Sequence, residues 1–115
     1  MKVICFDLDG IICNQTEGDY ENAIPNKEAI RVINRLYNEG NKIIISTSRF
    51  MRRNKNNIID TYKEGYEFTL KQLKNWKIKF HELNMGKPRY DFLVDDKSVF
   101  FKNDWEKIYK TLAGK

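Results

Sequence analysis

The stretch Val3-Ile4-Cys5-Phe6-Asp7-Leu8-Asp9-Gly10 decides the fold. Its first half, Val3 to Phe6, is a short, continuous apolar run rich in β-branched residues, which is typical of a strand buried on both faces in a parallel sheet. The run ends at Asp7. Ligands of open α/β sheets bind outside the carboxyl ends of the strands, so Asp7 and Asp9 stand where a binding site is expected.

The rest of the chain alternates between helical and strand patterns. The predicted elements are helices at 27–39, 66–76 and 105–112 and strands at 43–45, 78–81 and 92–94, in addition to the strand at 3–6. Asn103 and Glu106 form a predicted capping box for the last helix. The alternation predicts an α/β domain with a mainly parallel sheet of four to five strands and helices on both faces.

The length of 115 residues suits one domain, so residues 1–115 are predicted to form a single unit. Residues 10–26 are polar and irregular, and they are expected to form a loop or short flap. Residues 50–64 are charged and rich in Asn without clear periodicity. They are read either as a mobile loop or as a poorly ordered start of a helix.

The composition narrows the classes of partner. Lys and Arg outnumber Asp and Glu by 21 to 16, and the net charge of +5 favours anionic partners. No aromatic RNA-binding signature or zinc spacing accompanies the basic residues, so a solvated surface or a phosphate-attracting rim is preferred over nucleic-acid binding. The N-terminal apolar run is too short for a signal peptide or a membrane span, which makes the cytoplasm the expected location and excludes a membrane partner.

Acidic and hydroxyl side chains follow the predicted strands. Asp7 and Asp9 follow the first, Thr47 the second, and Asp95 and Asp96 the strand at 92–94. Carboxylates gathered at one sheet edge repel each other unless a cation lies among them. Mg²⁺ is the expected cation, because it prefers oxygen ligands and no His or Cys set accompanies these residues.

The same residue types suit the hydrolysis of a phosphate monoester. An Asp carboxylate can act as a covalent nucleophile, and a second carboxyl can protonate the leaving group and then deprotonate water. Asp7 and Asp9 are candidates for these two roles. Lys87 lies just before the strand predicted at 92–94 and can supply a further positive charge.

The motifs resemble those of the haloacid dehalogenase (HAD) superfamily, in the same order, from residue 3 to about residue 101. The segment 6–10 resembles the first motif, which implies Asp7 as nucleophile, Asp9 as acid/base and an aspartyl-phosphate intermediate. Ile45-Ser46-Thr47-Ser48-Arg49 resembles the second, which implies that Thr47 holds the phosphoryl group.

The third and fourth motifs complete this resemblance. Lys87 corresponds to a charge-neutralising lysine, Asp95 to a direct metal ligand and Asp96 to an inner- or outer-sphere helper. The resemblance implies a hydrolase with a three-layer Rossmann-like core and a Mg²⁺ ion bound by Asp7, Asp9, Asp95 and Asp96.

A closer resemblance is to small capless members described as capsular polysaccharide biosynthesis phosphatases. It is carried by Gly18-Asp19-Tyr20, Ala23-Ile24-Pro25 and the stretch 86–91. The short segments between motifs leave no room for a large cap domain. Capless relatives take larger substrates or borrow a neighbouring subunit as a lid, so a homo-oligomer and a sugar phosphate or capsule precursor as substrate are expectations. Ile11 and Ser48 depart from the family pattern without removing a reacting group.

Several assignments stay open at this stage. The candidate substrate contacts are Ser48, Arg49 and Tyr20, but Arg49 could instead pair with a neighbouring acid, and Tyr20 could pack the flap. His81 is expected to be a packed or edge histidine. The alternatives to a phosphatase are a phosphotransferase that uses the same intermediate and a non-enzymatic phosphate-binding module.

Overall fold

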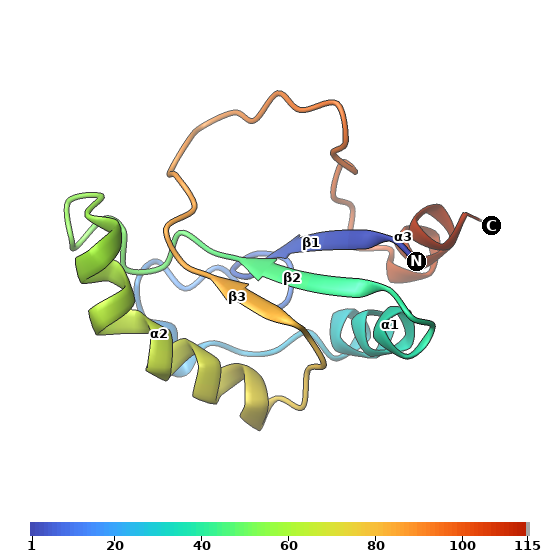
Figure 1. The fold of residues 1–115 in the computed structure, drawn as a ribbon, viewed down its shortest axis with the longest axis horizontal. Coiled ribbons are helices and arrows are strands. Elements are labelled where there is room, and N and C mark those ends of the chain that lie inside the picture. The colour runs from blue at the N-terminus through green and yellow to red at the C-terminus, as the bar shows by residue number, and fades with distance from the viewer. Residues whose placement is uncertain (115) are drawn as a thin grey trace.

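The computed structural model describes residues 1–114. Within them, the sheet has three parallel strands, β1 (Val3–Asp7), β2 (Lys42–Ser46) and β3 (Glu82–Asn84), with β2 in the centre (Figure 1). The register pairs Asp7 with Ser46 and Ser46 with Asn84. The three strands therefore end level with one another, and the residues that follow them share one edge of the sheet.

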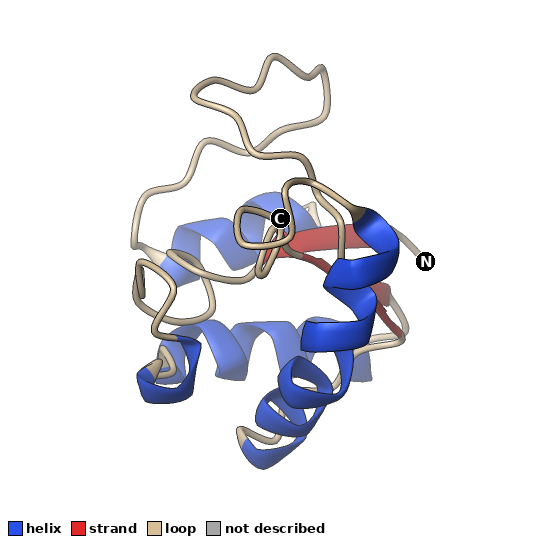
Figure 2. Cartoon of the chain, turned by 90° about the vertical axis from the view of Figure 1, so that its left-hand side faces the viewer, coloured by secondary structure: helices blue, strands red, loops and turns tan. Residues whose placement is uncertain are grey.

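Helices connect the strands. α1 (Lys27–Asn38) links β1 to β2, α2 (Ile58–Asn75) links β2 to β3, and α3 (Trp105–Ala113) follows β3. α1 packs against β2 and α3. The flap carries a 3₁₀ turn, η1 (Tyr20–Asn22). Figure 2 shows the long loop between β3 and α3 rising away from the sheet, as in Figure 1.

The helix predicted at 27–39 is confirmed, and its sequence explains why it forms. The side chain of Asn26 accepts hydrogen bonds from the backbone N–H groups of Glu28 and Ala29, which caps the first turn. One face of the helix is buried in the core: Ala29, Val32, Ile33 and Leu36. Burial of each larger aliphatic side chain contributes about 1.5–3 kcal/mol, so this face fixes α1 on the sheet.

The prediction of four to five strands is wrong for the described chain, which has three. Residues 92–94 form no strand, and Phe92 and Val94 are 90% and 98% exposed. The strand predicted at 78–81 lies at 82–84 instead. A short apolar run reports only the capacity to form a strand, because the pairing partner decides which residues enter the ladder.

The limits of two helices also differ from prediction. α2 begins at Ile58, inside the segment read as a loop or poorly ordered helix start, because the Asn57 side chain accepts from the N–H of Asp60 and caps it. The N-cap of α3 is Asp104, whose side chain accepts from the Lys107 N–H, and not the predicted Asn103. Neighbouring Asn and Asp residues are equally good caps, so the sequence could not separate them.

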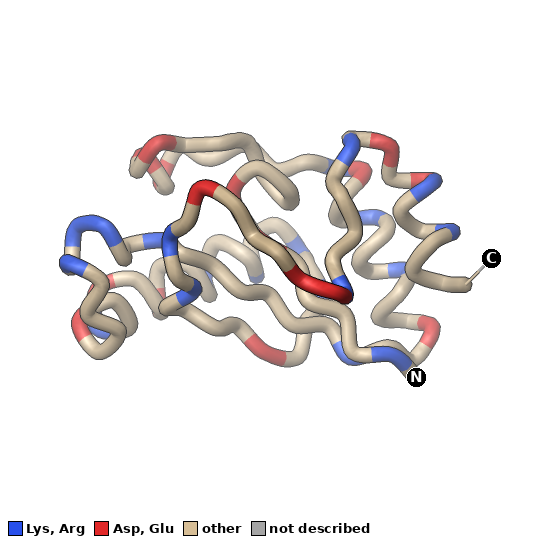
Figure 3. Tube along the Cα trace, turned by 90° about the horizontal axis from the view of Figure 1, so that it is seen from above, with Lys and Arg blue, Asp and Glu red and all other residues tan. Residues whose placement is uncertain are grey.

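Two features of the surface concern its charge and its apolar character. The turn between β2 and α2, at the left end of Figure 3, is basic. Its Arg53 forms an exposed ion pair with Glu64 at 3.0 Å and also donates to the flap carbonyl of Gly18 at 3.3 Å. Among the described residues, no helix combines the length and the apolar character that crossing a bilayer requires.

Candidate functional site

The carboxyl ends of the three strands are tied together by backbone hydrogen bonds. The N–H of Thr47, the residue after β2, donates to the carbonyl of Asn84 at 3.0 Å. The N–H of Lys87 donates to the carbonyl of Thr47 at 3.1 Å. Thr47 and Lys87 are thereby fixed beside the end of β1, where Asp7 lies. The structure brings three of the four predicted catalytic residues to one place through the backbone alone.

Asp7 and Lys87 face each other across this edge. The Lys87 Nζ lies 3.6 Å from Asp7 Oδ1, and the two side chains are 22% and 40% exposed. Burial lowers the pKa of Lys87, but the Tyr90 hydroxyl and the Asp7 carboxylate raise it by more, and the net direction is upward. Lys87 therefore stays cationic at neutral pH, and Asp7 Oδ1 also accepts a hydrogen bond from the Leu8 N–H at 2.8 Å.

A cavity of about 430 Å³ opens over this pair. Its volume falls within the range of small-molecule sites. The lining includes the predicted substrate contact Ser48, together with Asp7, Lys87, Pro88, Arg89, Tyr90 and Asp91. Arg89 and Tyr90 were not predicted as site residues. They belong to the stretch 86–91 that carries the closer family resemblance, but that resemblance assigned them no role in the site.

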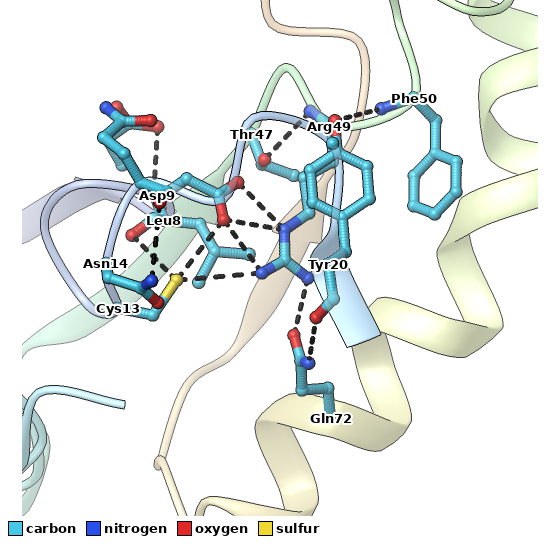
Figure 4. Close-up of polar contacts among 12 residues, drawn as sticks. Leu8, Asp9, Cys13, Asn14, Tyr20, Thr47, Arg49, Phe50 and Gln72 are labelled. Atoms are coloured by element: carbon cyan, nitrogen blue, oxygen red, sulfur yellow. Dashed lines mark hydrogen bonds and ion pairs between the residues drawn. The ribbon is translucent and has the colours of Figure 1, made fainter. Parts of the chain in front are cut away.

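Asp9 lies in a different environment. Arg49 Nε donates to both of its carboxylate oxygens, at 3.2 and 2.9 Å, and Arg49 Nη2 donates to Oδ1 at 2.9 Å (Figure 4). The Arg49 side chain is 0% exposed and that of Asp9 16%. Of the two readings left open for Arg49, the structure contains the ion pair with a neighbouring acid.

The Arg49 guanidinium has partners on its other sides as well. Nη1 donates to Gln72 Oε1 at 2.6 Å, and Nη2 reaches the Cys13 sulfur at 3.7 Å. The ring of Tyr20 covers the guanidinium, with its centroid 4.7 Å from the central carbon of that group. A buried cation that is paired and hydrogen-bonded in this way is held in one orientation.

Cys13 belongs to the same buried group. Its Sγ lies 3.3 Å from Asp9 Oδ1, toward which the thiol donates. Burial raises the pKa of Cys13, the Asp9 carboxylate raises it further, and Arg49 opposes both, with a net value of about 12. The thiol is therefore protonated at neutral pH.

Tyr20 occupies the flap-packing role that the sequence left open. Its hydroxyl accepts from the Phe50 N–H at 3.2 Å, and its ring lies 4.8 Å from the Phe50 ring. Its backbone carbonyl accepts from Gln72 Nε2 at 2.7 Å. The flap is thus fixed to α2 and to the turn after β2. Gln72 was missed because a lone amide on a half-buried helix face carries no sequence signal.

Phe50 can lie this close to α2 only because residue 65 is glycine. A Cβ added to Gly65 would meet the Phe50 ring at 2.3 Å. Phe50 itself has a positive φ of 68°, a conformation that few bulky residues adopt. The turn after β2 therefore depends on this close approach to α2.

The remaining predicted metal ligands are elsewhere. Asp95 and Asp96 lie in the exposed loop between β3 and α3, and Asp95 Oδ1 accepts from the Lys97 N–H at 2.9 Å. That N–H, with help from the Asp96 side chain, holds the pKa of Asp95 below its usual value. Within residues 1–114, no group of three or more His, Cys, Asp or Glu side chains is placed to hold a metal ion. The carboxylate chemistry suits Mg²⁺, but the arrangement described does not complete a site for it.

His81 fits the expectation of a packed or edge histidine, since it is exposed and its contacts are structural. Its Nδ1 accepts from the Ile43 N–H at 3.0 Å, and its ring stacks on Tyr37 with a centroid distance of 4.6 Å. The side chain therefore completes hydrogen bonding at the start of the β2–β3 pair.

Comparison with known proteins identifies the fold alone. No protein-family model matches the sequence, and no curated protein is similar to it. A crystal structure of an MCSG target from Vibrio cholerae superposes with a TM-score of 0.79 and 24% sequence identity, over 97% of this chain and 99% of that one. The two proteins share a small α/β fold over nearly their whole lengths.

Proposed function

We propose that the chain is a phosphatase that hydrolyses phosphate monoesters of small metabolites, with Asp7 as the nucleophile and Mg²⁺ as cofactor. The observation that carries the proposal is the placement of Asp7 and Lys87, 3.6 Å apart, in a cavity of about 430 Å³ at the carboxyl ends of parallel strands. A carboxylate nucleophile beside a fixed ammonium group is suited to an anionic phosphate ester, because the cation offsets the repulsion between the two anions.

The proposed reaction proceeds in two steps. An oxygen of Asp7 attacks phosphorus and forms an O–P bond, while the P–O bond to the leaving group breaks and the departing oxygen takes a proton from Asp9. Water, deprotonated by Asp9, then attacks phosphorus and releases inorganic phosphate and free Asp7. Thr47 is buried, and its Oγ1 accepts from the Arg49 N–H at 3.1 Å; in the proposed reaction its hydroxyl hydrogen would donate to the phosphoryl group.

The contacts of the two Asp9 carboxylate oxygens differ, which supports an assignment of the proposed proton transfer. Oδ1 accepts from Arg49 Nε, from Arg49 Nη2 and from Cys13 Sγ. Among the described residues, Oδ2 accepts from Arg49 Nε alone, at 2.9 Å. We assign the proton transfer to Oδ2, because it retains an open acceptor site.

The proposal also needs a fourth strand. β1 is an edge strand in the described sheet, and Phe92, Leu93 and Val94 are exposed. We propose that residues 92–94 add to β1 as a parallel strand, which would carry Asp95 and Asp96 toward Asp7. Burial of these apolar side chains would favour the addition. Mg²⁺, held by these carboxylates, would supply positive charge to the phosphoryl group.

The test is phosphate release from a panel of phosphorylated metabolites, with Mg²⁺ and with EDTA. We expect Asp7→Asn to abolish release and Asp9→Asn to lower it by about 10²–10⁴-fold, the usual contribution of general acid–base catalysis. Asp60→Asn, on the exposed start of α2, is the charge-matched control and should keep wild-type activity. Full activity in Asp7→Asn, or no release from any ester by the wild type, would refute the proposal.

A further inference from the structure

One side chain joins the flap to the buried ion pair. Gln72, on α2, accepts from Arg49 Nη1 through Oε1 at 2.6 Å and donates through Nε2 to the Tyr20 carbonyl at 2.7 Å (Figure 4). Both bonds come from the same amide group. Arg49 in turn holds both oxygens of Asp9. A continuous chain of contacts therefore runs from the flap to the candidate acid/base.

The orientation of the Gln72 amide follows from its neighbours. A guanidinium group only donates hydrogen bonds and a backbone carbonyl only accepts them, so the amide oxygen must face Arg49 and the amide nitrogen must face Tyr20. Glu lacks the donor and Met lacks both groups. Asn has the groups but is shorter by one methylene. Gln is thus the residue whose chemistry and length satisfy both partners.

Solvent water cannot replace a lost hydrogen-bond partner of the Arg49 side chain. Its side chain is 0% exposed, with Tyr20 over its face and Asp9 along its edge. Without the bond to Gln72, the hydrogen on Arg49 Nη1 that points toward α2 would be buried without an acceptor. Such unpaired buried donors are rare because they cost free energy. The guanidinium would shift to recover a partner, and the Asp9 carboxylate would move with it.

We propose that Gln72 is a positioning residue that couples the flap to the Asp9 carboxylate through Arg49. Its catalytic consequence rests on the proposed function, in which Asp9 transfers the proton. With Gln72 in place, a closed flap and an aligned Asp9 occur together. Opening of the flap at Tyr20 removes a bond from Gln72 and loosens Arg49, so proton transfer is suppressed while the flap is open.

The test compares the wild type with Gln72→Met, which keeps the length and apolar stem and loses both polar groups. Lys71→Met, at an exposed neighbouring position on α2, is the matched control. The measurements are kcat and KM for a phosphate monoester with Mg²⁺, hydrogen exchange of the flap amides at Asn22 and Ala23, and NMR exchange of the Arg49 Nε proton that faces Asp9.

In Gln72→Met we expect kcat to fall by about 10–100-fold with KM changed by less than about threefold, because small misplacements of a reacting group cost up to roughly 10² in rate. Exchange of the flap amides and of the Arg49 Nε proton should both accelerate by about tenfold or more. Lys71→Met should match the wild type in all measurements. Partial unfolding would also lower the apparent kcat without a change in KM, so kcat is expressed per folded molecule, and exchange of the Arg49 Nε proton separates positioning from a merely structural role.

Two outcomes overturn the coupling. One is a folded Gln72→Met protein with wild-type kcat and wild-type exchange of the Arg49 Nε proton. The other is faster exchange of the flap amides with no change at Arg49. If the wild type hydrolyses no ester, the proposed function fails by itself, and the exchange measurements still decide whether Gln72 couples the flap to Asp9.

Discussion

Asp7 and Asp9 are separated by one residue, yet the protein places them in opposite environments. Asp7 is 40% exposed and faces a single lysine in an open cavity. Asp9 is 16% exposed and is bound by a fully buried arginine, with a protonated thiol beside it. The exposed pair can meet a ligand without disturbing the fold. The buried pair belongs to the interior, and its geometry cannot change without a cost in stability.

The largest expected effect on stability is that of Arg49→Met, which removes the buried partner of Asp9. The substitution leaves the largely buried Asp9 carboxylate without its cation, and loss of one partner of a buried pair typically costs about 3–5 kcal/mol. We expect the unfolding free energy to fall by an amount near the lower end of that range, since the Asp9 side chain keeps some contact with water. Urea unfolding gives the value. Arg53→Met, at a half-exposed ion pair, should cost less than about 1 kcal/mol, and equal losses for the two variants would contradict the contrast.

The thiols offer a second test. The pKa of Cys13 is raised from 9.0 to about 12, which lowers the thiolate fraction at pH 8 by roughly 10³-fold. We expect a thiol reagent to label Cys5, which is exposed, and to leave Cys13 unlabelled until the protein is unfolded. Cys5→Ser should abolish labelling of the native protein. Rapid native-state labelling of that variant would show that the Asp9 environment is open to solvent.

Gly65→Ala tests the packing that holds the flap. Alanine favours a helix by about 1 kcal/mol over glycine, but here its Cβ would meet the Phe50 ring at 2.3 Å. We expect the steric clash with Phe50 to outweigh the gain in helix propensity, so that the unfolding free energy falls by roughly 1–3 kcal/mol, as is usual for overpacking. Glu67→Ala, at an exposed position of α2, is the control. A gain in stability for Gly65→Ala would show that Phe50 is free to move away.

The smallest expected effect on stability is that of Lys87→Met. The Lys87–Asp7 pair is only partly buried, and ion pairs near the surface contribute about 0–1 kcal/mol, so the variant should unfold nearly as the wild type does. Because the pKa of Lys87 is raised in the folded protein, its charge stabilises the fold fully at pH values below the ordinary pKa of 10.5. This contribution disappears as the pH rises through the folded-state pKa. The difference between wild type and variant should therefore vanish in strong alkali. A large difference that persists there would assign Lys87 a packing role.

The sequence predicted the parts of the fold that local patterns specify. The amphipathic face of 27–38, the apolar runs of β1 and β2 and the placement of Asp7, Thr47 and Lys87 at one sheet edge all follow from spacing. The start of α2 did not, because Gly65 and the Asn-rich turn weaken the helical pattern. The glycine at position 65 is required by the tertiary contact with Phe50, which the sequence does not show.

The site was predictable in its residue types and only partly in its contacts. A sequence cannot show whether Arg49 faces a substrate or an acid, since that depends on which side chains the fold encloses with it. Gln72 became visible only as the shared partner of Arg49 and Tyr20. In the structure, residues 92–94 form a loop in which Phe92 and Val94 are exposed. The proposed function requires these residues to join the sheet as a strand, which remains a prediction.

The unpaired edge of β1 has a consequence for behaviour in concentrated solution. An edge strand presents backbone donors and acceptors on which a strand of another molecule can add. The net charge of +5 makes two molecules repel each other, and dissolved salt screens that repulsion. Unless residues 92–94 cover the edge first, ionic strength is expected to set how much of the protein remains monomeric.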